Sequence, residues 1–115
     1  MDFSIPPRTQ DLLATVRSFV EAELFPLEPL LASELFRALL PQLQAKRALV
    51  KARGLWAPHV AKIHGGMGLS FLDHALISQE LGRSPLGHYV FNCQAPDAGN
   101  MELLAEVGTP AQQET

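Results

Sequence analysis

The first quarter of the chain has the hydrophobic spacing of an amphipathic helix. Between Pro7 and Leu24, apolar side chains recur every three or four residues, and polar or charged side chains fill the positions between them. The apolar positions are Leu12, Leu13, Val16, Phe19, Val20 and Leu24. This pattern predicts a helix over residues 7–24 with one buried stripe.

Prolines interrupt the next part of the sequence. Pro26 and Pro29 lack main-chain N–H groups and disfavour helical dihedral angles at the residues before them. We therefore expect the first helix to stop at these prolines and a connector to follow. Leu30 to Leu40 is compatible with a further short helical piece.

A second long helix is expected to start at Pro41, because proline suits the first turn of a helix. Gly54 would end it, and Leu55 would pack back on the last turn as in a Schellman motif. The apolar face of this helix would consist of Ala45, Ala48, Leu49 and Ala52.

The segment from Leu55 to Leu69 contains Pro58 and three glycines and has no sustained apolar period, so it predicts a surface loop. Ser70 and Asp73 form a capping signal for a helix that runs to about Leu81. Its apolar residues surround most of the helix circumference, which is typical of a central, buried helix. They are Leu72, Ala75, Leu76, Ile77 and Leu81.

The C-terminal third predicts one more helix and the start of another. Met101 to Val107 is helical in pattern and is followed by Gly108. Thr109, Pro110 and Gln112 then occupy N-cap, N1 and N3 positions, but one helical turn is not stable alone. We therefore expect residues 1–115 to be one domain of a longer protein, either a fragment or part of a split protein.

No segment alternates with period two over a strand's length, so the predicted fold class is all-α, with about five helices and a glycine-rich loop. The chain has 115 residues, nine Lys+Arg against twelve Asp+Glu, and one cysteine. This charge balance argues against a nucleic-acid partner, and the single cysteine excludes an internal disulfide. No apolar run reaches the length of a membrane span, and Met1 to Gln10 lacks the features of a signal peptide. We expect a cytoplasmic protein.

Read for chemistry alone, the sequence contains no recognisable catalytic centre. Gly65-Gly66-Met67-Gly68 lacks the context of a P-loop or a dinucleotide fingerprint, so a sharp turn before Ser70 is the preferred interpretation. The four histidines lack metal-ligand spacing, and Cys93 has no adjacent base, so packing is the preferred role of this thiol. The histidines are His59, His64, His74 and His88. No catalytic residue and no metal ligand is predicted.

Several strings, in their order along the chain, resemble the N-terminal helical domain of the acyl-CoA dehydrogenases. They are R-S-F-V-E-A-E-L-F-P-L at 17–27, G-L-W-A-P-H-V-A-K-I-H-G-G-M-G-L-S at 54–70, L-I-S-Q-E-L-G-R-S at 76–84, F-N-C-Q-A-P-D-A-G-N-M-E-L-L at 91–104 and G-T-P-A-Q-Q-E at 108–114. The string at 91–104 is most similar to the branch that includes kinase-fused members acting on 4-hydroxyacyl-CoAs.

The resemblance implies part of a flavoprotein of fatty acid metabolism. In such an enzyme a carboxylate removes the α-proton of an acyl-CoA, and the β-hydrogen passes as hydride to FAD. The family's flavin surface and catalytic base lie in a middle β domain and a C-terminal helical domain, which this chain lacks. The resemblance therefore implies that this chain alone is inactive and does not retain FAD. It also implies an acyl-CoA substrate and either a homo-oligomer or association with the later domains.

By the same resemblance, the segment from Phe91 to Asn100 lines the acyl-chain cavity. The residues implied are Phe91, Asn92, Gln94, Asp97 and Asn100. Two interpretations of this polar segment stay open: it contacts a hydroxylated acyl chain, or Asp97 is a helix N-cap with Asn100 at N3 and the others face solvent. At the level of the whole chain, the alternative to a dehydrogenase component is a stand-alone helical interaction or binding module without catalysis.

Overall fold

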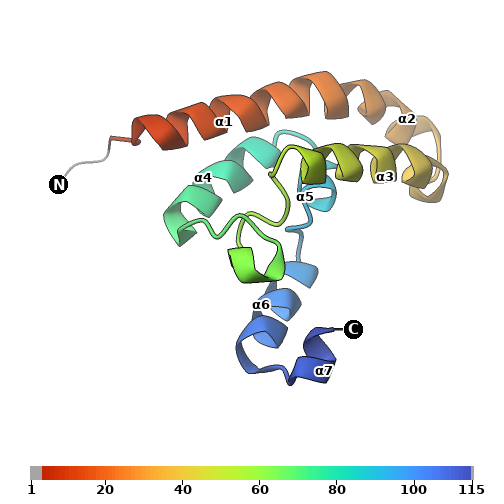
Figure 1. Cartoon of the computed structure of the whole chain (residues 1–115). Coiled ribbons are helices and arrows are strands. Elements are labelled where there is room, and N and C mark those ends of the chain that lie inside the picture. The colour runs from red at the N-terminus through yellow and green to blue at the C-terminus, as the bar shows by residue number, and fades with distance from the viewer. Residues whose placement is uncertain (1–3, 115) are drawn as a thin grey trace.

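The computed structural model describes residues 4–114, so the first three residues of the Met1 to Gln10 segment lie outside the described part. The prediction of an all-α fold is confirmed, since residues 4–114 form seven α-helices and no strand. The helices are α1 (Pro7–Phe19), α2 (Glu28–Ser33), α3 (Phe36–Ala52), α4 (Phe71–Leu81), α5 (Gly87–Val90), α6 (Asp97–Val107) and α7 (Pro110–Gln113). Figure 1 shows α1, α3 and α4 forming the body, from which α6 and α7 project as an arm.

The prediction of a helix over 7–24 is confirmed, but the expected stop at Pro26 is wrong. A π-helical turn, Val20–Leu24, follows α1, and a 3₁₀ turn, Phe25–Leu27, leads directly into α2. Pro26 and Pro29 each occupy a position in the first turn of a new helical segment. A main-chain N–H is not needed there, so the chain stays helical through both prolines.

The predicted start and buried face of the second long helix are also wrong. α3 begins at Phe36, and Pro41 lies inside it on the exposed side, where the carbonyl that loses its helical donor can be solvated. Its buried residues are Leu39, Leu43 and Val50, whereas the expected face of Ala45, Ala48, Leu49 and Ala52 is exposed.

The predicted end of this helix is confirmed. Gly54 adopts a φ of 69°, and its N–H donates to the Lys51 carbonyl at 3.0 Å. The N–H of Leu55 donates to the Val50 carbonyl, also at 3.0 Å. These two bonds are the pair that defines a Schellman motif, and Leu55 is buried, as is common for the residue after the glycine in this motif.

The predicted cap and length of α4 are confirmed, but its predicted central position is wrong. The Ser70 hydroxyl accepts a hydrogen bond from the Asp73 N–H at 3.1 Å, and the helix ends at Leu81. Within it only Ile77 and Leu81 are buried, while Phe71 is 88% exposed. An all-round apolar helix is normally covered on every side, so this open face of α4 is a surface on which another element could pack.

One continuous core lies between α1, α3, α4 and α5. Phe19 and Phe91 are both fully buried and make an edge-to-face contact, with ring centroids 5.3 Å apart and planes at 89°. Aliphatic side chains from the π turn, α3 and the end of α4 surround this pair. Burial of these apolar groups is the main contribution to stability in a chain without disulfides.

Polar contacts fix α1 against α4 at both ends of their interface. The Thr9 hydroxyl donates to a carboxylate oxygen of Asp73 at 3.0 Å. The Arg17 guanidinium donates two hydrogen bonds to Glu80, at 2.5 and 3.1 Å. Hydrogen bonding to Arg17 is the main cause of the lowered pKa of Glu80. The two helices are therefore held in one register by side chains more than 60 positions apart.

Candidate functional site

The segment from Phe91 to Asn100 connects α5 to α6 and is anchored at its first residue. Phe91 lies in the core against Phe19, and its main-chain carbonyl accepts a hydrogen bond from the Ala57 N–H at 2.9 Å. The segment therefore leaves the core at a fixed point. The Phe91 side chain itself faces inward and not toward a surface.

Asn92 has a left-handed backbone, with a φ of 58°, a conformation that asparagine tolerates better than most residues. Its side-chain oxygen accepts a hydrogen bond from Nη2 of Arg47 at 3.1 Å, and its side-chain nitrogen donates to the sulfur of Met101 at 3.5 Å. Both polar atoms of this half-buried amide thus have partners within the chain. A polar substrate is not needed to satisfy them.

Arg47 organises the surroundings of this turn, and sequence reasoning missed it. Its Nη1 also donates to the main-chain carbonyl of Tyr89, and its guanidinium lies 4.6 Å from the ring centroid of Trp56 and 4.7 Å from that of Tyr89. The two rings and the two acceptors together hold the guanidinium in one orientation. Its partners are separated from it by up to 45 positions, so no local pattern indicates the cluster.

The remaining predicted residues lie just before α6 and in its first turn. Gln94 is half-buried, and its main-chain carbonyl accepts from the Ala98 N–H at 2.9 Å. Asp97 and Asn100 are exposed. The interpretation of Asp97 as an N-cap is wrong by one residue, since Pro96 holds the N-cap position and Asp97 is the first helical residue. Its charge near the helix N-terminus is still favourable.

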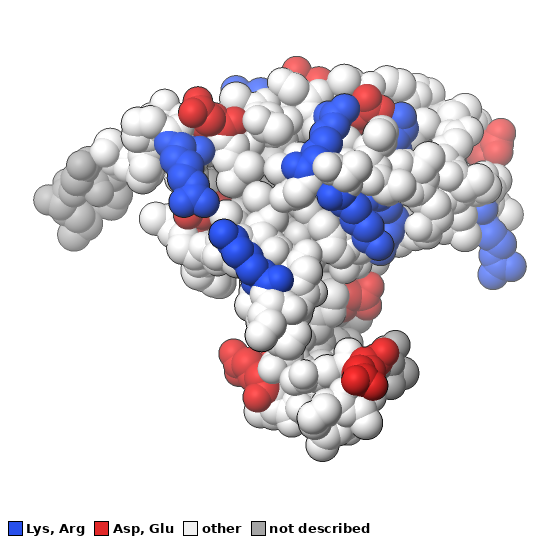
Figure 2. Space-filling model, viewed as in Figure 1, with Lys and Arg blue, Asp and Glu red and all other residues white. Residues whose placement is uncertain are grey.

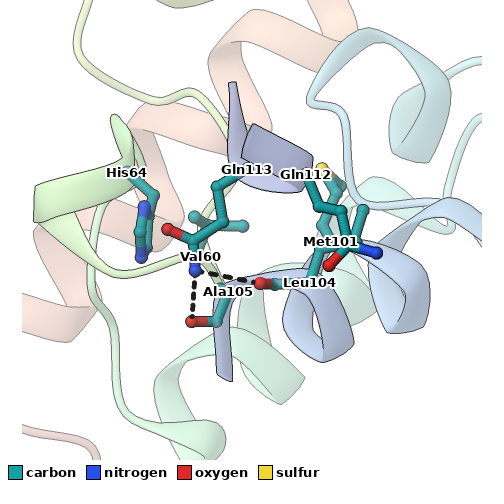
Figure 3. Close-up of a pocket in the computed structure, with 7 residues that line it drawn as sticks. All are labelled: Val60, His64, Met101, Leu104, Ala105, Gln112 and Gln113. Carbon is teal, nitrogen blue, oxygen red and sulfur yellow. Dashed lines mark hydrogen bonds between the residues drawn. The ribbon is translucent and has the colours of Figure 1, made fainter. Parts of the chain in front are cut away.

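Two adjoining cavities lie between α6 and the loop before α4, and they share Val60, Met101 and Ala105. One has a volume of about 180 Å³ and is closed on one side by α7, as Figure 3 shows. There, Nε2 of Gln113 donates to the carbonyls of Leu104 and Ala105 at 3.1 and 3.2 Å. The other cavity measures about 210 Å³ and is lined by His59, Glu102 and Glu106 as well. Each is smaller than the ~300 Å³ lower limit typical of ligand pockets.

Two half-buried imidazoles lie near the second cavity. The rings of His59 and His74 have centroids 5.3 Å apart, and both His59 nitrogens and Nδ1 of His74 are buried without a hydrogen-bond partner. Burial, and secondarily the neighbouring His59, lower the pKa of His74. Within residues 4–114, no three His, Cys, Asp or Glu side chains are grouped to hold a metal ion.

Ser78 and His88 make a contact that resembles a nucleophile and its base. The Ser78 hydroxyl oxygen lies 2.7 Å from Nε2 of His88, and burial lowers the pKa of that histidine. A hydrolytic site also needs a space for a substrate beside the pair. Neither residue lines the cavities described above, so the contact joins α4 to α5.

The preferred role of Cys93 as a packing residue is confirmed. The side chain is 6% exposed, and burial raises the pKa of the thiol to about 12. A thiol with this pKa is almost entirely protonated at neutral pH and is a poor nucleophile.

The glycine-rich loop does not fit the phosphates of a flavin nucleotide. The N–H groups of Gly65, Gly66 and Gly68 donate to the carbonyls of Lys62, Ala61 and Val60. The N–H groups of Met67 and Leu69 donate to the carbonyls of Ala57 and Pro58, earlier in the same loop. A Cβ atom on Gly66 would lie 2.1 Å from the Val60 carbonyl oxygen. The preferred interpretation, a sharp turn before Ser70, agrees with this geometry, because a phosphate cradle needs free N–H groups.

The fold and the site thus describe an all-helical domain with a fixed turn at Asn92 and no built phosphate site among its described residues. Residues 6–115 match the sequence profile of "Acyl-CoA dehydrogenase, N-terminal domain". The chain belongs to the acyl-CoA dehydrogenase family. No helix within residues 4–114 is long and apolar enough to cross a membrane.

Known proteins of this family are similar over almost the whole chain. Acyl-CoA dehydrogenase family member 11 from Gallus gallus is 35% identical over 111 residues, which are 90% of this chain and 14% of that protein. (R)-benzylsuccinyl-CoA dehydrogenase from Thauera aromatica is 33% identical over 99% of this chain and 30% of its own length. A solved structure from Mycobacterium abscessus, assigned to the acyl-CoA dehydrogenases, superposes with a TM-score of 0.82 at 34% identity. The superposition covers 98% of this chain and 31% of the solved chain.

Proposed function

We propose that this chain forms the N-terminal helical part of an FAD-dependent acyl-CoA dehydrogenase, which converts an acyl-CoA to a trans-2-enoyl-CoA in fatty acid metabolism. The observation that carries the proposal is the match to the family's N-terminal domain over residues 6–115. The relatives are several times longer than this chain, and the complete enzyme would be a homo-oligomer built from such longer chains.

Within this enzyme, the segment from Phe91 to Asn100 would line one side of the acyl-chain cavity. Asn92 and Gln94 are its half-buried members, and Asp97 and Asn100 are exposed and available to a neighbouring domain. Phe91 would support the wall from behind, since it is fully buried. Arg47 supports this role because it fixes the turn at Asn92 from outside the segment.

FAD and the catalytic base would come from other parts of the enzyme. The glycine-rich loop supports this division, because its N–H groups already have acceptors within the loop. We therefore expect the purified chain to show no flavin absorbance and no acyl-CoA-dependent dye reduction. Stoichiometric flavin with turnover in this chain alone would contradict the proposal.

The decisive experiment is a chimera. The part of (R)-benzylsuccinyl-CoA dehydrogenase that aligns with this chain, 30% of that enzyme, is replaced by residues 1–115. We expect the chimera to retain FAD and to reduce an electron-acceptor dye in the presence of benzylsuccinyl-CoA. The enzyme without this part is the control and should lose the dye reduction. A chimera that folds and binds FAD but does not turn over would instead favour a stand-alone helical module without catalysis.

A further inference from the structure

A larger cavity lies between α1 and the glycine-rich loop, and no residue of α6 lines it. Its volume is about 480 Å³, within the ~300–1,000 Å³ range of small-molecule pockets. Three half-buried apolar side chains at the edge of the core line it: Leu12, Met67 and Leu69. The cavity therefore offers an apolar surface to the non-polar part of a ligand.

Two cations line the same cavity from different elements. Arg8 belongs to α1 and Lys62 to the loop, and both are exposed. Neither makes an ion pair with another residue in the range 4–114. A Cβ atom on Gly68 would lie 3.2 Å from Cγ of Lys62, so the stem of this lysine packs closely on the loop. Two positive charges thus border one cavity without an ion-pair partner in the described part of the chain.

The position of Arg8 is electrostatically unfavourable in the chain alone. It is the second residue of α1, whose first turn contains no acidic residue. A cation at this end of a helix is repelled by the helix dipole, and no nearby ion pair offsets this cost. A residue that breaks a local rule of stability in this way is a candidate for a functional role. Figure 2 shows basic side chains over the body on this face, whereas the charged atoms on the arm of α6 and α7 are red.

We propose that this cavity binds the carboxylate of a medium-chain fatty acid, with the head group between Arg8 and Lys62 and the alkyl chain on the apolar lining. A guanidinium matches a carboxylate with two parallel hydrogen bonds, and an ammonium group adds a second charged contact. The N–H groups of the glycine-rich loop are bonded within the loop, so side chains recognise the head group. Asp11 also lines the cavity, which leaves two positive groups against one negative group. This balance suits a ligand with one negative charge better than a phosphorylated ligand with several.

This inference goes beyond the proposed function, because the site involves neither FAD nor the other domains of the enzyme. It is therefore tested on this chain alone, by titration with octanoate followed by NMR of methyl-labelled methionine. The Met67 methyl reports on this cavity, and the Met101 methyl, in the cavities beside α6, is the internal reference. We expect a saturable shift of the Met67 signal with a dissociation constant of about 1 mM, since the ligand is small and the cations are exposed.

A neutral ligand tests the role of charge. Octanol has the same alkyl chain without the carboxylate, and it should bind about tenfold more weakly than octanoate. Equal affinities for the acid and the alcohol would overturn the proposal. So would the absence of a saturable shift at Met67, or a shift at Met101 alone.

Removal of the two cations gives the sharper test. Arg8→Gln with Lys62→Gln should weaken octanoate binding by about tenfold and leave octanol binding unchanged. Asp11→Asn should strengthen octanoate binding by about threefold, because it removes the opposing carboxylate. All three positions are exposed, and circular dichroism verifies the fold of each variant.

Arg37→Gln with Lys51→Gln is the matched control, because it removes the same two residue types from exposed positions of α3. This control should bind octanoate as tightly as the parent chain. An equal loss in the two double variants would overturn the proposal, since it would show a general effect of net charge. Weaker binding by Asp11→Asn would overturn it as well. Neither result would bear on the dehydrogenase activity proposed for the complete enzyme.

Discussion

Arg47 and Asn92, 45 positions apart in the sequence, are joined by a 3.1 Å hydrogen bond that holds the turn between α5 and α6. The same guanidinium donates to the carbonyl of Tyr89 and stacks on Trp56. The entry of the chain into the proposed acyl-facing segment is therefore determined by a residue of α3.

Arg47→Met should destabilise the chain by about 2 kcal/mol, because it removes two hydrogen bonds to partly buried acceptors and leaves them unpaired. Urea unfolding followed by Trp56 fluorescence measures the change. Arg37→Met, on the exposed part of the same helix, is the control and should cost less than about 0.5 kcal/mol. Equal losses in the two variants would show that Arg47 does not hold the turn.

Two glycines offer a matched test of the packing between α4 and α5. A Cβ atom on Gly87 would lie 2.2 Å from the Leu81 carbonyl oxygen, whereas one on Gly99 would meet nothing within 4 Å. Gly87→Ala should therefore cost about 1–3 kcal/mol of unfolding free energy through overpacking. Gly99→Ala should raise stability by about 0.5–1 kcal/mol, since alanine is the better helix former. A neutral Gly87→Ala would contradict the close approach.

The sequence predicts the elements of this fold better than their packing. The Schellman stop at Gly54 and the cap at Ser70 depend on neighbours within five residues, so local pattern is sufficient to find them. The exposed stripe of α3 was predicted as the buried face because apolar spacing does not tell which of two faces the core selects. Pro26 does not stop the helix because it lies in the first turn of the 3₁₀ segment that follows a π turn, and no residue pattern indicates that π turn. The Arg47 cluster is not predictable because its partners lie far apart in the sequence.

Stability should depend on pH through His74 and His88. Burial lowers the pKa of both below the ordinary 6.5, so the unfolded chain binds more protons than the folded chain once the pH falls below that value. Above pH 6.5 both histidines are neutral and the folded chain has its full stability. This stability is lost as the pH falls toward their pKa values in the folded chain. The unfolding free energy should therefore decrease between pH 7.5 and 5. Lys46 and Arg17 lower the pKa values of Glu23 and Glu80, so the stabilisation from these two carboxylates is lost only when the pH falls below about 4.5.

Urea unfolding at pH 7.5, 6 and 5 measures this dependence. His74→Gln should flatten the profile, whereas His64→Gln, which changes an exposed histidine, should leave it unchanged. The assignment fails if both variants keep the slope of the parent chain.

Cys93 should resist thiol reagents in the folded chain, because burial raises the pKa of its thiol to about 12 and covers the sulfur. With a disulfide reagent at pH 8, we expect labelling only at the rate at which the chain opens, and complete labelling in denaturant. Rapid stoichiometric labelling of the folded chain would show that the segment after Phe91 is open.

Photo-crosslinking in the chimera described above tests most directly whether this chain lines the acyl cavity. An acyl-CoA analogue that has a diazirine at the far end of its acyl chain is bound to the flavin-loaded chimera, irradiated, and mapped by peptide mass spectrometry. The proposal predicts label within residues 92–100, and excess unlabelled substrate should prevent it. Label confined to the parts that come from the Thauera aromatica enzyme, in a chimera that turns over, would contradict it.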